Sequence, residues 1–471
     1  MRRCAILVLV LAGSRMLAAQ NPPAQSTESR PTPAPAMSVS ALSALIGGGA
    51  SVTEEDTSGS LPQIPSMLGG QGTSLALQAE QERSNYVRGG INIGTSFDDN
   101  ASLASSGAVS NTIYSVFPNI AIEQTFSRLR WNLGYAAGMT VNQKLSNRNQ
   151  ASQALKFDSQ FRLSPHVNLR VAEDFSLTSG FFDSGAGAGL VGGGSPNANL
   201  IAPLSRQRSS STVAAVDYHF ALKDMVGASG SFSDLHFSDL APSAILANTR
   251  TTSGSAFWLH GLFGRDWIGA SYRFQRLTFE PGTGKTMVHS LLFINTFSLP
   301  GRFTLTGFVG PEYSDNRGLT SGSVAQVAHF TQTSVAGGAD IGWQKEHTTL
   351  AAGFSRHIQD GGGVLGAVRL QSIHGDIRQQ LFPGWAAGLS VSYGNNKALT
   401  VPISSSASSV DAATLGASLE RNLGRNVGLD LEYGHEFQDR SGTTDPAFRG
   451  GAHRNRFSVT IGYQWVRPLG R

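Results

Sequence analysis

The histidines are the residues of this chain best suited to catalysis or metal binding, and their spacing points to neither. Five of them are dispersed over the second half of the sequence: His289, His329, His357, His374 and His435. None belongs to a His-Glu-x-x-His zinc helix, and the chain lacks the Gly-x-Ser-x-Gly turn that presents a nucleophilic serine. We therefore predict no catalytic residue, no metal site and no cofactor site, and hence a protein that is not an enzyme.

Two other features that might carry chemistry are explained more simply. The segment Gly282–Thr286 reads Gly-Thr-Gly-Lys-Thr, but a phosphate-binding loop has an earlier glycine and joins a strand to a helix. Here it joins two expected strands, so we interpret it as a hairpin loop. The one cysteine, Cys4, lies at the start of an apolar run near the N-terminus. Disulfides, thiolate catalysis and cysteine metal sites are therefore excluded from the mature chain.

Composition limits the class of protein. Asp, Glu, Lys and Arg make up only 14% of the residues, glycine contributes 55 of the 471, and 40% are hydrophobic. The net charge of +4 comes from scattered basic residues, so we expect no nucleic-acid partner. Beyond the N-terminal segment, no stretch approaches the ~18 apolar residues of a membrane-spanning helix. The chain could still be periplasmic, secreted or inserted as a barrel, and its periodicity must decide.

The N-terminal part is divided into two segments. Residues 1–20 combine Arg2-Arg3, an apolar run and small residues near Ala18-Ala19, which predicts a secretory signal peptide. Residues 21–85 are rich in Pro, Ser, Ala and Gly, so they cannot bury enough apolar surface to fold alone. We expect a disordered periplasmic arm. Its amphipathic piece around Leu75–Glu82 leaves open a second role as a plug or a partner-binding segment.

From residue 86 to 471 the pattern changes to an alternation of apolar and polar residues with a period of two, which predicts strands with two different faces. In the last such segment Phe457, Ile461 and Trp465 share one face, while Ser458 and Thr460 share the other. Many of these segments run to 12 or more residues, whereas ordinary strands have about five or six. Strands of this length are typical of a tilted membrane span.

The connections favour a closed transmembrane barrel. Short turns such as Ser127-Arg128 and Pro383-Gly384 alternate with longer loops such as 98–110 and 179–207, as in outer-membrane barrels. We count about eighteen antiparallel strands in up-and-down order, with sixteen as the alternative; 225–237, 285–298 and 364–380 alternate least clearly. An even count places both termini in the periplasm, and unpaired edges in lipid require closure.

Five tryptophans are expected to form an aromatic girdle at the periplasmic interface, because they fall at strand ends next to the short turns: Trp131, Trp258, Trp343, Trp385 and Trp465. Trp267 lies at the same level, but the alternation turns it inward.

A barrel of this size is wide enough for an aqueous channel. The residues expected to line it are the charged ones on the polar faces: Arg88, Glu123, Lys156, Asp158, Arg162, Arg170, Asp174, Asp217, Arg273, Asp340, Arg369, Glu420, Asp430, Glu432 and Arg456. Their signs nearly balance, and selective pores use rings of one sign, so we expect weak ion selectivity. The glycine-rich loop 179–207 is either a constriction or an ordinary extracellular loop.

The segments Tyr114–Ile120 and Trp131–Tyr135 resemble the early strands of the outer-membrane β-barrel porins that include proteins associated with exopolysaccharide operons. The resemblance implies an outer-membrane pore, with a link to polysaccharide export or surface anchoring. The chain departs from the usual assembly signal, because Trp465 is followed by Val466–Arg471 rather than ending the chain.

The sequence thus predicts an integral protein of the bacterial outer membrane that forms a water-filled, weakly selective pore for small solutes or exported polysaccharide. Its expected partners are outer-membrane lipid and the barrel-assembly machinery. The alternative is a non-conducting surface barrel whose extracellular loops bind polysaccharide or a protein.

Overall fold

A computed structural model describes residues 85–101, 105, 107–145, 149–178, 206–238, 247–262, 266–280, 284–319, 327–399, 409–441 and 451–469. The predicted signal peptide and almost all of the predicted arm lie outside these residues, as does the loop over 179–205.

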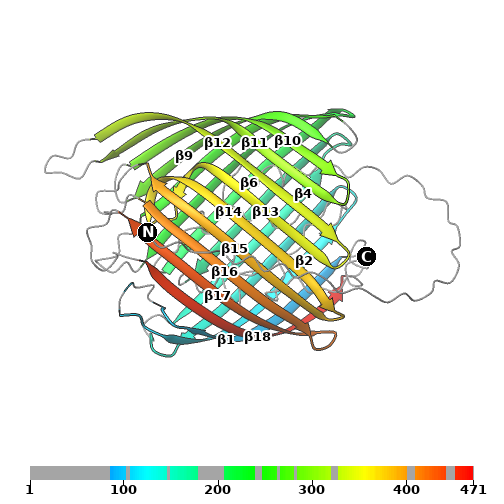
Figure 1. Cartoon of the computed structure of the whole chain (residues 1–471). Coiled ribbons are helices and arrows are strands. Elements are labelled where there is room, and N and C mark those ends of the chain that lie inside the picture. Colours follow the sequence, from blue (N-terminus) through cyan, green and yellow to red (C-terminus); the bar gives the residue numbers. More distant parts are fainter. Residues whose placement is uncertain are drawn as a thin grey trace, which may run out of the picture. The chain divides into compact units, whose positions relative to one another are not determined.

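The described residues form one antiparallel sheet of eighteen strands (Figure 1). In chain order they are β1 Tyr86–Asp98, β2 Asn111–Thr125, β3 Leu129–Asn142, β4 Gln150–Arg162, β5 Val167–Thr178, β6 Arg206–Ala221, β7 Asp224–Ser238, β8 Asn248–Gly261, β9 Trp267–Glu280, β10 Gly284–Leu299, β11 Phe303–Leu319, β12 Val327–Lys345, β13 Thr348–Gly361, β14 Leu365–Phe382, β15 Trp385–Ala398, β16 Ser409–Asn422, β17 Val427–Ser441 and β18 Ala452–Pro468. Among the described residues there is no helix long and apolar enough to cross a membrane.

Each strand pairs with the next one along the chain, and β1 pairs with β18, which closes the sheet into a barrel. The closing register runs from Tyr86↔Pro468 to Asp98↔Arg456. The predicted all-β, up-and-down barrel of eighteen strands is therefore confirmed. The first strand begins, and the last ends, at the end of the barrel where connections such as 126–128 and 222–223 are short. We call this the short-turn end, and the opposite one the long-loop end.

The two faces of the wall differ as the alternation predicts. One face carries large exposed apolar side chains, such as Ile93 (54% exposed), Leu291 (56%) and Ile461 (51%). The opposite face carries most of the charged strand residues. On this charged face, side chains from strands far apart in the sheet contact one another, since Leu235 of β7 and Val410 of β16 belong to one buried cluster. Such contacts are made only across the interior, so this is the inner face and the exposed apolar face is the outer one.

The wall is interrupted between β12 and β13. Their pairing runs only from Lys345↔Thr348 to Gly337↔Arg356, although β12 begins as far away as Val327. Beyond Arg356, β13 stays paired with β14. Every residue from His357 to Val368 is buried, whereas a hairpin in the wall would keep one face exposed. The end of the β13–β14 hairpin therefore leaves the wall and enters the barrel.

Candidate functional site

The tip of the β13–β14 hairpin reaches the opposite wall of the barrel. Two buried clusters fix it there. In the first, Val364, Leu365 and Val368 pack with Leu235, Phe237 and Val410. In the second, Ala367 packs with Leu277 and Phe279 of β9, with Leu399 beside them. Because β7 and β9 are five to seven places from β14 in the sheet order, the tip spans the interior at the long-loop end.

The turn at this tip depends on glycine. Gly362 and Gly363 have φ of 58° and 80°, values that glycine adopts far more readily than other residues. The Asp360 carboxylate accepts a hydrogen bond from the Gly362 N–H at 2.9 Å, and the Gly363 carbonyl accepts one from the Ala247 N–H at 2.8 Å. A Cβ on Gly363 would collide with the Phe237 ring. The turn is thus shaped to dock closely against the facing wall.

A carboxylate on the wall holds the root of the hairpin. Glu312 of β11 accepts a hydrogen bond from the Ile358 N–H at 3.3 Å. The hydroxyls of Ser290 and Ser334, on the flanking strands, donate to the same carboxylate at 3.3 and 3.4 Å. Glu312 is buried, so these donors replace the water that a carboxylate otherwise requires.

The charged residues of the inner face are largely paired with one another. Five of these ion pairs have nitrogen to oxygen distances of 2.7–3.7 Å: Arg88–Glu123, Arg130–Glu123, Lys156–Asp174, Arg170–Asp158 and Arg378–Glu420. Nearer the long-loop end, Arg454 pairs with Glu436 and lies 4.0 Å from Asp98. Positive and negative charges therefore alternate along this wall.

The structure places the predicted pore-lining residues as follows. Side chains on the inner face belong to Arg88, Glu123, Lys156, Asp158, Arg162, Arg170, Asp174, Asp217, Arg273, Asp340, Glu420, Asp430, Glu432 and Arg456. Arg369 differs from these in its parity. It pairs with Ile358 and shares its face of β14 with Ile373 and Ile377, which are exposed outside the barrel. Arg369 lies at the root of the inward hairpin, where the simple division into lumen and lipid faces fails.

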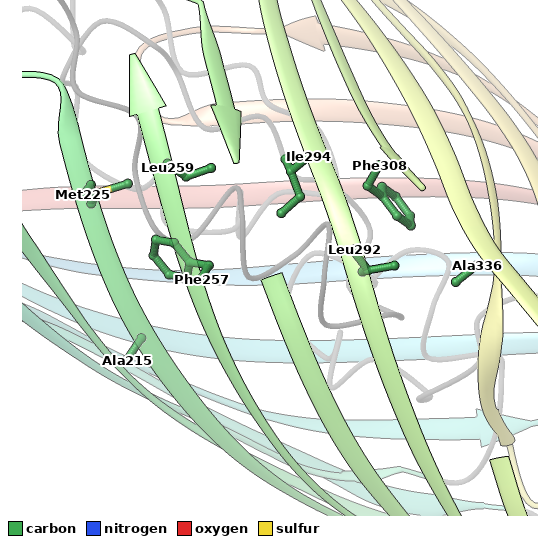
Figure 2. Packing of buried hydrophobic residues seen from close by; sticks show 8 residues of the cluster. All are labelled: Ala215, Met225, Phe257, Leu259, Leu292, Ile294, Phe308 and Ala336. Carbon is green, nitrogen blue, oxygen red and sulfur yellow. The ribbon is translucent and has the colours of Figure 1, made fainter. Parts of the chain in front are cut away.

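Part of the inner wall is apolar, which a polar inner face does not predict. A buried cluster on β6, β7, β8, β10, β11 and β12 comprises Ala215, Met225, Phe257, Leu259, Leu292, Ile294, Phe308 and Ala336 (Figure 2). Trp267 packs against it, in keeping with its inward parity. The available signal was apolar residues at both parities, as in Ala256-Phe257-Trp258-Leu259, which is typical of a strand covered on both sides. The interior thus has a charged arc and an apolar arc.

The five tryptophans predicted to form a girdle lie on the outer face, at strand ends next to the short-turn end: Trp131, Trp258, Trp343, Trp385 and Trp465. Polar or cationic groups accompany three of them. The Trp343 indole N–H donates to the Gly301 carbonyl at 3.1 Å. The guanidinium groups of Arg421 and Arg467 lie 4.8 and 5.8 Å from the ring centroids of Trp385 and Trp465. Such amphipathic surroundings are typical of a membrane interface.

Within the described residues, no group of three or more His, Cys, Asp or Glu side chains is arranged to hold a metal ion. His289 and His435 lie on the outer face among aromatic rings, and His357 is buried in the inward hairpin. In the described part of the chain, the side-chain partners of the five dispersed histidines are Tyr272, Asp315, Gln359, Asp340 and Asn455.

No protein-family model matches the chain, and no curated protein matches its sequence. Solved structures with a similar fold include OccK2 (OpdF) of Pseudomonas aeruginosa, with a TM-score of 0.42, 9% identity and coverage of 81% of this chain and 98% of that one. The outer membrane protein OpdK of the same species has a TM-score of 0.41 and 10% identity, with coverage of 81% of this chain and 99% of that one. OccAB4 of Acinetobacter baumannii has a TM-score of 0.41 and 11% identity, with coverage of 82% of this chain and 99% of that one. At these identities the likeness concerns the barrel fold alone.

Proposed function

We propose that this protein is an integral outer-membrane barrel that forms a water-filled pore for small solutes, narrowed at the long-loop end by the β13–β14 hairpin. The observation that carries the proposal is the contrast between the two faces of a closed wall. The outer face exposes apolar side chains, and the inner face carries alternating charges. Such a wall is stable between lipid outside and water inside.

The width of the barrel supports conduction. Barrels of sixteen to eighteen strands leave an aqueous channel unless inserted segments fill it, and this one has eighteen. The hairpin tip crosses the interior at one level, so the narrowest passage is expected beside residues 357–368. The mixture of opposed charges along the wall favours weak ion selectivity, because no ring of one sign is present among the described inner residues.

The membrane placement follows from the same features. The short-turn end, with both ends of the sheet and the tryptophans, is proposed to face the periplasm, where the arm over 21–85 would also lie. The long-loop end would face outward. Insertion would require the barrel-assembly machinery, which must accept a last strand that continues past Trp465 to Pro468.

Conductance of the purified mature chain in a planar bilayer tests the proposal. We expect stable, stepwise channels whose reversal potential in a salt gradient stays close to zero. A correctly folded protein that produces no channels, with heat-modifiable gel mobility as the check on folding, would refute the pore.

One observation favours a second candidate. Because the hairpin tip is fixed across the interior, a non-conducting barrel whose loops bind polysaccharide or a partner is the natural alternative. The resemblance to barrels of exopolysaccharide operons supports the same class of ligand, and it also supports export of that polymer through the pore. A folded protein without conductance that retains polysaccharide on an affinity column would favour the surface barrel.

A further inference from the structure

A group of basic side chains lies on the outer face at the long-loop end of β6 to β11. We define the basic belt as Arg208, Arg250, Arg276, Lys285 and Arg317. Each shares the outward parity of exposed apolar residues lower on the same strand, such as Val216 on β6 and Leu291 on β10. Lys285 is half-buried and the other four are exposed.

The sheet register brings these residues side by side. Arg250 pairs with Thr278, Thr278 with Lys285, and Lys285 with Arg317, so three bases follow one line of adjacent strands. Arg276 lies two residues from Thr278 on β9, on the same face. Neighbouring side chains on one face of a sheet are close enough to bind a single ligand.

Acidic residues on this surface neutralise only part of the charge. Asp234 accepts from Arg208 at 3.2 Å and from Arg250 at 3.4 Å, which leaves one net positive charge. Asp315 pairs with Arg317 at 3.3 Å, and Glu280 lies at the top of β9. Among the described residues, neither Arg276 nor Lys285 has a carboxylate partner. The shared Asp234 also fixes two guanidinium groups in place, which prepares them for an anion.

The belt lies at the expected upper boundary of the hydrocarbon. On β8, Trp258 follows Arg250 by eight residues on the same face, or roughly 20 Å along the barrel axis for strands tilted by about 40°. Directly below the belt, Tyr272 and His289 share a hydrogen bond of 2.8 Å, and Phe274 and Tyr313 contact the same imidazole. An aromatic layer under a charged layer is typical of the lipid headgroup region.

We propose that the basic belt binds the phosphate groups of a lipid headgroup in the leaflet at the long-loop end. Arginine forks match phosphate oxygens in pairs, and Arg276 and Lys285 provide positive charge that has no carboxylate partner among the described residues. The proposal rests on the membrane placement given above, but it does not require the barrel to conduct. Solvated arginines that contact only water are the simple alternative.

Native mass spectrometry of the mature chain in a neutral detergent tests this binding, with diphosphoryl lipid A as the probe. We expect retained lipid A in the unmodified protein and roughly 25-fold weaker binding in the double variant Arg276→Gln and Lys285→Gln, since each basic residue near an anionic lipid contributes about fivefold. The matched control is Lys397→Gln, because Lys397 is an exposed outward base at the same end on β15. It should bind like the unmodified protein.

Two further arms decide the source of the effect. Dephosphorylated lipid A should be lost as readily from the unmodified protein as diphosphoryl lipid A is from the double variant; equal retention of both lipids would overturn the proposal. Unchanged lipid A binding by the folded double variant would also overturn the proposal. So would lipid-free oligomers of the unmodified protein that dissociate in the double variant, because the basic belt would then be a contact between copies of the chain. Should that variant not fold, Arg317→Gln carries the test. Bilayer conductance of the same samples separates a failed pore from a failed lipid site.

Discussion

The backbone N–H of Ile358 donates to the Glu312 carboxylate at 3.3 Å although β13 and β11 are not neighbours in the wall. The strand between them, β12, is no longer paired with β13 beyond Arg356. This contact therefore marks the point at which the hairpin turns from the wall into the interior. It links a buried wall carboxylate to the position of the segment that narrows the barrel.

The variant Glu312→Ala is expected to loosen the root of the hairpin. It removes the acceptor of the Ile358 N–H and of the Ser290 and Ser334 hydroxyls, and unpaired buried donors cost about 1–3 kcal/mol. Single-channel recordings should show higher and noisier conductance. Glu280→Ala, at an exposed carboxylate on the outer face, is the control. Identical open-channel levels in Glu312→Ala and the unmodified protein would contradict this role.

The variant Leu365→Asp addresses the tip rather than the root. Leu365 has no exposed surface and packs in the cluster with Leu235 and Phe237. A carboxylate there is not compatible with an apolar contact, since burying an unpaired charge costs several kcal/mol. The tip should leave the facing wall and conductance should rise, while the folded gel mobility of the barrel stays unchanged. Leu365→Met, which preserves the apolar contact, should conduct like the unmodified protein.

The strands with the weakest alternation in the sequence are those whose inward side chains pack inside the barrel. The segments 225–237, 285–298 and 364–380 alternate weakly because their inward positions include Met225, Leu292, Ile294 and Val368, which pack in buried clusters. Elsewhere the inward positions are polar and the outward ones apolar, so successive residues differ in chemistry and the strands are evident. The departures from alternation thus mark interior packing.

The sequence pattern did not indicate the inward hairpin, for a related reason. The length and glycine content of loop 179–207 leave it open as a constriction or an ordinary extracellular loop, and residues 179–205 lie outside the described part of the chain. The hairpin that enters the interior uses a three-residue turn, Gly362–Val364, between two strands. Its position depends on contacts between strands far apart in the sequence, such as Val364 with Phe237. The local signal was the apolar run Val364–Val368, with hydrophobic residues at both parities.

The variant Arg454→Ala should destabilise the seam of the barrel. Arg454 is 3% exposed in its side chain, pairs with Glu436 and lies 4.0 Å from Asp98, so it connects β18 to both β17 and β1. Removing one partner of a buried ion pair leaves the other charge uncompensated, at about 3 kcal/mol or more. The free energy of unfolding in urea should fall by that amount. Arg162→Ala, at an exposed inner residue near the short-turn end, should change it far less.

The ion selectivity of the pore is expected to depend on three carboxylates on β16 and β17. Glu420 and Asp430 are directly opposite each other in the sheet register, and Glu432 follows on the same face. Arg378 pairs with Glu420 at 2.7 Å, so this part of the wall keeps an excess of negative charge that the opposed pairs elsewhere do not show.

Replacing Glu420, Asp430 and Glu432 by Gln, Asn and Gln removes that excess but preserves size and hydrogen bonding. The reversal potential in a salt gradient should therefore shift toward anions, whereas Glu173→Gln, on the outer face of β5, should leave it in place because that carboxylate does not face the lumen. An unchanged reversal potential in the triple variant would mean that permeating ions do not pass along this part of the wall.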